Sequence, residues 1–353
     1  MKIAILSDGP NINSGYGIVA RNLGIGLKEL GYDVKYVSFQ HAGNPVKYMD
    51  FEIYEGSNTA GITRSLEDAD AVIHIRDAFY YSNKWFATAY QVKNLTKKKV
   101  YLYTPVQSDN LPNEFLQACM YDADFCVAMT EWAKNVLIFE GVPVDRLFSV
   151  KPGMMASEPD GSVSFSSPTV GSVGVVDQYR KDFPALIAGF SEFRKTNREW
   201  NLYIHAPSML GASDLIHFAR RFGVKPMYPS GISRTWGWSD AEMASMYSSL
   251  KIYASTSIAE GYNMPLVEAA AYTGVIVATD MPNHREALSG FDGVVWIPAK
   301  KIYPTAWSFE WVVDPIDVAH ALDRAKDMKP KKKVLTSYRD MAKGFDQVLN
   351  STM

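Results

Sequence analysis

The sequence predicts an α/β fold made of two doubly wound parallel sheets. Three observations predict it. Short apolar runs of β-forming residues alternate with amphipathic helical patterns, a stretch rich in Ser, Gly and Pro breaks the alternation near the middle, and 353 residues exceed the size at which one hydrophobic core usually stops growing. We therefore expect domains at 1–158 and 159–335 that face each other across a cleft. A helix within 336–353 is expected to return and brace the first domain.

The first half contains five expected strands. They read KIAILS from Lys2, VKYVSF from Val34, AVIHI from Ala71, KVYLYT from Lys99 and DFCVAM from Asp124. An amphipathic helix over 15–30 lies between the first two strands, and Gly31 ends it as a C-terminal cap. Strands and helices that alternate in this way build a parallel sheet covered on both faces.

After the linker at 153–169 the alternation resumes. The expected strands read VGSVGVV from Val170, NLYIHA from Asn201, KPMYPS from Lys225, KIYAST from Lys251 and VIVATD from Val275. Helical patterns cover 184–195, 213–222, 240–250 and, at the end of the chain, 337–349. The second half therefore predicts a second parallel sheet of the same kind.

The composition is that of an ordinary globular protein. A formal net charge of -2 and 21% charged residues give no argument for nucleic acid as a partner. Cys119 and Cys126 have no cluster of His or Cys around them, so we expect both to be reduced core residues. The apolar run of MKIAILSDG is too short for a signal peptide, and no apolar stretch approaches the length of a membrane span. We expect a soluble, cytoplasmic protein.

The segment EGYNMPLVEAAAYTG carries the clearest chemistry. It is expected as a loop after the strand KIYAST that runs into a helix, with Glu260 at the strand's carboxyl edge and Glu268 in the first helical turn. Backbone N–H groups at 261–264 would then be unpaired donors at the positive end of a helix dipole, which suits a phosphate or diphosphate. A simpler reading is that Glu268 only complements the dipole and Glu260 is solvated. An anion site between two carboxylates, however, suits a nucleotide sugar.

Two glutamates separated by seven residues in EGYNMPLVEAAAYTG closely resemble the hallmark of retaining GT-B glycosyltransferases, family 4 (group 1) in particular. The resemblance implies two Rossmann-like domains. It also implies that Glu260 contacts the transferred sugar and Glu268 the ribose hydroxyls. The amides of the remaining donor-loop residues would hold the distal phosphate: Gly261, Tyr262, Asn263 and Met264. The chain departs from the family pattern at Asn263, where glycine is usual.

Further stretches extend the resemblance over most of the chain. SDGPNINSGYGIVARNL is similar to the family's first loop and helix, where a glycine turn lets the backbone approach the donor; Gly15 and Gly17 would otherwise be only a tight turn. VGSVGVVDQYRKDF resembles the segment whose Arg and Lys clamp the diphosphate. The usual Arg is replaced by Val175. Lys181 is therefore carried over as the diphosphate contact and Arg180 as the replacement charge.

Other candidate residues follow strands. On the acceptor side, TPVQSDNLP has no histidine where many family members have one, and Asp109 lies in this loop. His74, in the strand AVIHI, and His205, after NLYI, either line the site or are structural histidines. Trp236 and Trp238 would either stack on a nucleobase or pack at a loop corner.

The resemblance implies transfer of a hexose from a UDP- or GDP-sugar to a hydroxyl of a carbohydrate, lipid or protein acceptor, with retention and without a metal or other cofactor. The departing phosphate would deprotonate the acceptor. Lysine runs at 97–99 and 329–333 read as solvated faces or as contacts to an anionic membrane surface. The sequence does not indicate an oligomeric state. Two alternatives remain open: a sugar-nucleotide epimerase of the same fold, and a protein that binds nucleotide sugars without catalysis.

Overall fold

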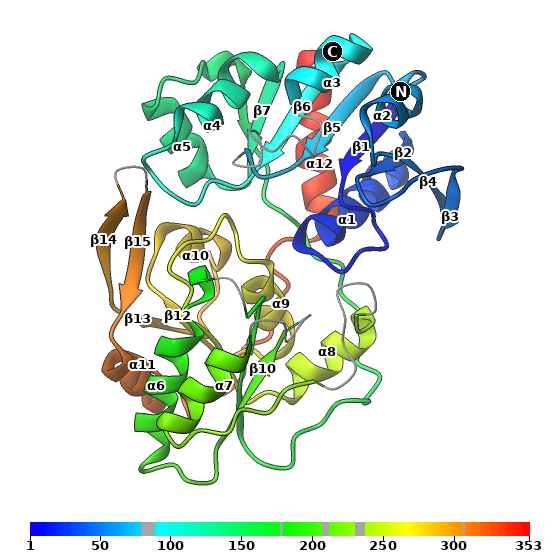
Figure 1. Ribbon diagram of the computed structural model, residues 1–353. Coiled ribbons are helices and arrows are strands. Elements are labelled where there is room, and N and C mark those ends of the chain that lie inside the picture. The colour runs from blue at the N-terminus through cyan, green and yellow to red at the C-terminus, as the bar shows by residue number, and fades with distance from the viewer. Residues whose placement is uncertain (79–88, 177–178, 207–211, 230–236, 306–307) are drawn as a thin grey trace. The chain divides into compact units, whose positions relative to one another are not determined.

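The computed structural model describes residues 1–78, 89–176, 179–206, 212–229, 237–305 and 308–353 (Figure 1). The chain divides into two compact units. The first comprises Met1–Met155 together with Thr336–Met353, and the second is Ala156–Leu335. Each unit is an α/β domain built around a mainly parallel sheet, so the predicted fold class is confirmed.

The first unit contains an eight-stranded sheet in the order β3-β4-β2-β1-β5-β6-β7-β8. All neighbouring strands are parallel except the antiparallel edge pair β3 and β4. The strands are β1 (Lys2–Ser7), β2 (Asp33–Ser38), β3 (Val46–Tyr48), β4 (Phe51–Glu55), β5 (Ala71–Ile75), β6 (Lys99–Thr104), β7 (Phe125–Ala128) and β8 (Leu147–Ser149).

Helices cover both faces of this sheet. A hydrophobic core lies between one face and the helices that follow β4 to β7. The helices are α1 (Gly15–Glu29), α2 (Thr59–Leu66), α3 (Ala89–Thr96), α4 (Asn113–Gln117), the π-helix η2 (Ala118–Asp122), α5 (Glu131–Phe139), the short 3-10 helix η3 (Val144–Arg146) and α12 (Tyr338–Thr352). The buried free thiols Cys119 and Cys126 lie 3.1 Å apart between η2 and β7.

The last helix of the chain belongs to the first unit. A capping box of Ser337 and Asp340 starts α12, and its apolar side packs beside α1 (Figure 1). The helices approach closely because α1 has glycine at position 26, where an added Cβ would lie only 2.6 Å from the Cβ of Ala342. The ring of Phe345 meets Tyr103 of β6 edge to face, with centroids 4.9 Å apart.

The second unit has a five-stranded, fully parallel sheet in the order β10-β9-β11-β12-β13, and a separate antiparallel hairpin, β14-β15. One core packs against α6, α7 and α11, and another against α8 and α9. The strands are β9 (Thr169–Val173), β10 (Asn201–His205), β11 (Ile252–Ser255), β12 (Ile276–Thr279), β13 (Val294–Ile297), β14 (Ala299–Thr305) and β15 (Ser308–Val313). The helices are the 3-10 helix η4 (Tyr179–Lys181), α6 (Phe183–Arg194), α7 (Ala212–Arg221), α8 (Asp240–Ser249), α9 (Met264–Tyr272), α10 (Pro282–Ala287) and α11 (Pro315–Ala325).

One expected strand was wrong. KPMYPS from Lys225 was predicted as a strand, but its described part forms only a single bridge, between Met227 and Tyr203 of β10. Pro226 and Pro229 flank that bridge, and proline has no N–H to donate to a strand ladder. Among the described residues, no helix combines the length and the apolar character that a bilayer span requires.

The glycine turn that opens α1 has one restrictive position. A Cβ added at Gly17 would lie 2.3 Å from the carbonyl oxygen of Ile12 and 2.8 Å from that of Gly9, whereas nothing lies within 4 Å of one added at Gly15. Because both obstacles at Gly17 are backbone atoms, Gly17→Ala is expected to lower the free energy of unfolding by about 1–3 kcal/mol, as overpacking does. Gly15→Ala serves as the matched control and should stay within about 0.5 kcal/mol of the parent. Urea titrations of the two variants test this, and equal midpoints would contradict it.

Candidate functional site

The candidate site lies where the chain order of the second sheet reverses. From β9 the chain passes through α6 to β10 on one side, and later returns to β11 on the other side of β9. In open α/β sheets, ligands bind outside the carboxyl ends of the strands at such a switch point. Arg180 and Lys181 follow β9, and Glu260 follows β11. The fold therefore brings the predicted cations and the first predicted carboxylate to one edge.

These three side chains form one ionic cluster. The Nζ of Lys181 donates to Oε1 of Glu260 at 2.6 Å, and Nη1 of Arg180 donates to Oε2. Glu260 and Lys181 are buried, whereas the side chain of Arg180 is 32% exposed. Gly174 makes the approach of Lys181 possible, since a Cβ at that glycine would lie about 3.0 Å from the aliphatic carbons of the lysine.

The cluster keeps Glu260 ionised. Burial alone would raise the pKa of this carboxyl, but the charges of Arg180 and Lys181 outweigh burial and lower its pKa to about 2. Burial also lowers the pKa of Lys181, and the carboxylate of Glu260 opposes that shift. The cluster thus contains two basic side chains and one carboxylate.

The donor loop, residues 260–264, leads into the N-terminus of α9. Asn263 adopts a left-handed conformation, φ 69°, and its side chain does not cap the helix. Within the described part of the chain, no hydrogen bond engages the backbone N–H of Gly261, Asn263 or Met264. Unpaired donors at the positive end of a helix dipole suit an anion.

Glu268 lies in the second turn of α9, not in the first turn as expected, because the helix already begins at Met264. The hydroxyl of Tyr247, on α8, donates to Oε2 of Glu268 at 2.7 Å. The simpler reading required Glu268 in the first turn, where α9 has no acidic residue, and it required a solvated Glu260, which is wrong because Glu260 is buried. Tyr247 was not predicted, because only the fold brings α8 beside α9.

His205 is at the end of β10 and is buried. Its ring packs edge to face against Trp238 with centroids 4.7 Å apart, and its Nδ1 lies 3.1 Å from the hydroxyl of Tyr203. Burial lowers its pKa to about 4, so the ring is neutral at pH 7. Trp236 lies outside the described residues.

The acceptor-side candidates, His74 and Asp109, both lie in the first unit. His74 on β5 is buried with neither ring nitrogen hydrogen-bonded to a described residue, and burial lowers its pKa to about 3. Asp109 is half-buried in the loop after β6.

The first sheet also reverses its chain order, between β1 and β5, and a polar cluster that sequence reasoning missed lies there. Asp8 accepts from Ser14 at 2.6 Å, from Gln40 at 2.8 Å and from Arg76 at 3.3 Å. Ser14 caps α1 through the N–H of Gly17, so the glycine turn is tied to this cluster. The sequence signal that could have revealed this cluster is Asp8, a carboxylate directly after the first strand.

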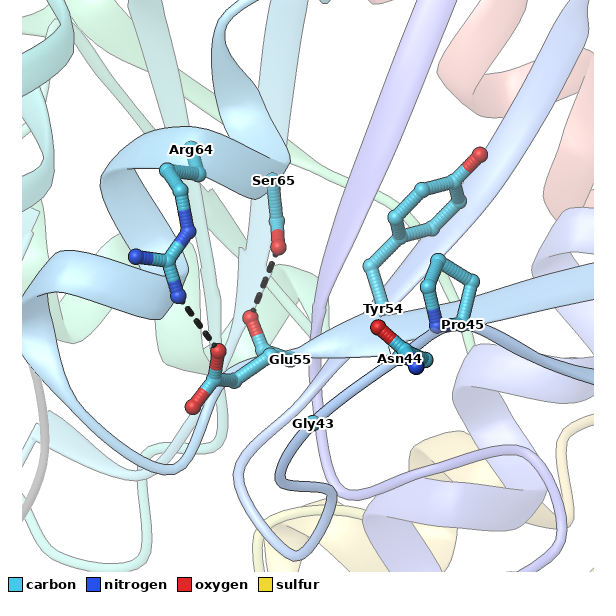
Figure 2. A pocket seen from close by; sticks show the side chains of 7 residues that line it. All are labelled: Gly43, Asn44, Pro45, Tyr54, Glu55, Arg64 and Ser65. Carbon is cyan, nitrogen blue, oxygen red and sulfur yellow. Dashed lines mark hydrogen bonds and ion pairs between the residues drawn. The ribbon is translucent and has the colours of Figure 1, made fainter.

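A separate hollow of about 390 Å³ lies in the first unit beside β4 and α2. Figure 2 shows Glu55 directed toward Arg64, and the two form an ion pair of 2.8 Å. Ser65 donates to the carbonyl oxygen of Glu55. The hollow contains none of the predicted site residues; its lining is Gly43, Asn44, Pro45, Tyr54, Glu55, Arg64 and Ser65.

Buried neutral histidines make the second unit sensitive to acid. Burial lowers the pKa values of His205 and His284 to about 4, from a reference of 6.5. Between these values the unfolded chain binds more protons than the folded chain, so stability is full above pH 6.5 and is lost as pH falls toward 4. We expect a lower urea midpoint at pH 5 than at pH 7, and a smaller difference for His205→Gln. Equal midpoints for the parent protein would contradict the expectation.

Comparisons with known proteins agree with this architecture. Residues 167–308 match the family described as glycosyl transferases group 1, a range that includes Arg180, Lys181, Glu260 and Glu268. No curated protein sequence matches the chain.

Solved structures with the same fold cover nearly the whole chain. Sucrose-phosphate synthase from Thermosynechococcus elongatus is 13% identical with a TM-score of 0.73, over 99% of this chain and 98% of its own. Anabaena HepE in complex with UDP and glucose is 11% identical with a TM-score of 0.69, over 99% and 100%. The lipopolysaccharide outer core galactosyltransferase WaaB is 16% identical with a TM-score of 0.64, over the full length of both chains. The fold is GT-B.

Proposed function

We propose that this protein is a glycosyltransferase that moves a hexose from a nucleoside diphosphate sugar to a hydroxyl acceptor, with retention at the anomeric carbon. One observation carries the proposal. At the switch point of the second sheet, unengaged backbone donors at the start of α9 share a strand edge with the ionic cluster of Arg180, Lys181 and Glu260. The match of residues 167–308 to glycosyl transferases group 1 and the complex of HepE with UDP and glucose support this reading.

The donor's charged centre fits the amides and cations. A diphosphate needs hydrogen-bond donors and positive charge, which the backbone at 261–264 and the side chains of Lys181 and Arg180 supply. Glu268, held by Tyr247, offers a carboxylate to the ribose hydroxyls. A carboxylate suits such hydroxyls because it accepts two hydrogen bonds.

The chemical barrier is charge separation as the sugar leaves the diphosphate. Preorganised donors and cations stabilise the negative charge that gathers on the leaving group, and Glu260 orients the sugar. In line with the family resemblance, the departing phosphate takes the acceptor's proton on the same face. Lys181, Arg180 and the helix N-terminus fill the electrostatic role that a metal ion has in other transferases, so the proposed reaction is metal-independent.

A non-catalytic nucleotide-sugar-binding protein is the second candidate, and one observation favours it. Both oxygens of Glu260 are engaged by Lys181 and Arg180, so a sugar hydroxyl would have to share them. Such a protein would bind the donor and release no nucleoside diphosphate with any acceptor.

The experiment is a thermal-shift screen of UDP, GDP, ADP and their sugars, followed by an assay of nucleoside diphosphate release with a panel of hydroxyl acceptors. We expect the nucleotides of one nucleobase to raise the midpoint temperature of thermal unfolding, because a ligand that binds only the folded form stabilises it by mass action. We also expect release that depends on an acceptor. No shift with any nucleotide would reject the proposed donor, and binding without release would favour the second candidate.

We further propose that the protein works in the cytoplasm, where its two free, buried thiols remain reduced. The acceptor is a carbohydrate, lipid or protein hydroxyl. Lysines at 97–99 and 329–333 would favour contact with an anionic membrane surface if the acceptor is a lipid.

A further inference from the structure

Asn263 occupies the position in the donor loop where the backbone must turn left-handed. At φ 69° and ψ 69° most side chains are strained, and glycine and asparagine are the residues that tolerate it. An asparagine before a helix usually caps it, but the side chain of Asn263 makes no cap hydrogen bond. This side chain therefore has another use.

The amide group of Asn263 points away from the helix end and into buried polar neighbours. Its Nδ2 donates to the Oγ of Ser255 at 3.1 Å and to the Nε2 of His284 at 3.0 Å. The Nδ1 of His284 donates to the carbonyl oxygen of Thr279 at 2.9 Å, because a carbonyl can only accept. Hence the proton of the neutral ring is on Nδ1, and Nε2 is free to accept from Asn263.

Asn283, the residue before His284 on α10, contacts the other end of the donor loop. The Nδ2 of Asn283 donates to the backbone carbonyl oxygen of Glu260. Asn283 and His284 are both buried, 3% and 0% exposed. Two consecutive residues of α10 thus fix both ends of the segment that presents the amides of the anion site.

We propose that Asn263 and His284 are positioning residues: their side-chain hydrogen bond, anchored on Ser255 and Thr279, holds the donor loop in the geometry that presents its amides to the diphosphate. Asn263 thereby supplies two things at one position, the left-handed turn and a tether. The diphosphate part of the inference rests on the proposed function, whereas the tether itself does not.

The test separates the tether from the turn. Asn263→Gly keeps the left-handed backbone without strain and removes the tether. We expect hydrogen exchange of the Leu266 amide, which donates to the backbone carbonyl oxygen of Asn263 at 3.0 Å, to become roughly tenfold faster. The Kd for UDP, or for the diphosphate that the screen selects, should rise by a similar factor, since one or two hydrogen bonds are lost. Hydrogen exchange of the backbone amides of α11 should not change and serves as the internal control.

Variants of His284 provide the second arm. His284→Gln retains one acceptor and one donor and should partly restore slow exchange, whereas His284→Leu fills space without hydrogen bonds and should behave like Asn263→Gly. The double variant Asn263→Gly/His284→Leu should be no worse than either single variant, because both remove the same interaction. His320→Leu, on the exposed side of α11, is the matched control.

The tether and the proposed function are decided by different measurements. Exchange and Kd within twofold of the parent in Asn263→Gly, or additive effects in the double variant, would overturn the tether. If the parent binds no nucleoside diphosphate, the proposed function fails, and the exchange measurements alone still decide whether Asn263 and His284 hold the loop.

Discussion

Replacing Glu260 with glutamine is expected to lower turnover about 100-fold or more while the protein still binds the free nucleoside diphosphate, the effect typical of removing one positioned polar group from a site. The carboxylate is buried and ionised, so it would present a fixed negative charge to the proposed sugar. Glutamine has nearly the same size and still accepts from Lys181. Affinity for the diphosphate should stay equal or increase, because a negative charge beside the two cations is gone.

Turnover is measured as acceptor-dependent release of the nucleoside diphosphate, and affinity by calorimetry. Glu192→Gln, on the surface of α6 in an exposed pair with Lys195, is the matched control and should not differ from the parent. A folded Glu260→Gln protein with unchanged turnover would remove Glu260 from the mechanism. Loss of diphosphate binding instead would assign the residue to the phosphate site.

Replacing Lys181 with methionine is expected to weaken binding of the nucleoside diphosphate about 30-fold or more, the range for loss of a hydrogen bond to a charged group. The ammonium is buried beside Glu260, so solvent screens its charge little. The corresponding effect of Arg180→Met should be several times smaller, because its side chain is 32% exposed. The comparison decides which of the adjacent cations is the principal clamp.

Calorimetry with the diphosphate measures both variants, and Lys195→Met controls for loss of an exposed lysine from the same region. Because Lys181→Met leaves Glu260 with a single cation, urea unfolding must first show that the variant is folded. A larger effect for Arg180→Met, or near-parental affinity for Lys181→Met, would contradict the assignment.

Local patterns predicted the repeated elements well, because each is encoded within a few residues. The strand KIAILS was predicted at its observed bounds, and the helix over 15–30 ends, as expected, where Gly31 turns left-handed at φ 91°. KPMYPS failed because Pro226 and Pro229 have no N–H to donate, so that only Met227 between them pairs with the edge strand β10. The hairpin β14-β15 was missed because no strong turn signal separates its strands.

The candidate site was predictable only where a motif is continuous in the sequence. Glu260 and Glu268 come from one such motif, and the pair Arg180 and Lys181 from a second. Tyr247 and His284 were missed, because their partners are 21 residues away and only the packing of α8 and α10 beside α9 brings them together. Their roles come from hydrogen bonds, and no spacing rule encodes these.

The return of α12 to the first unit reverses the usual order in which domains mature during synthesis. The unit Ala156–Leu335 is continuous, so it can fold as soon as it leaves the ribosome, whereas the first unit lacks the helix that packs on α1 until Tyr338–Thr352 are translated. During that interval the nascent chain exposes the surface that Ala342 and Phe345 will bury. The first unit is therefore completed after the second, and a chain that stops before Tyr338 lacks part of the domain whose synthesis began first.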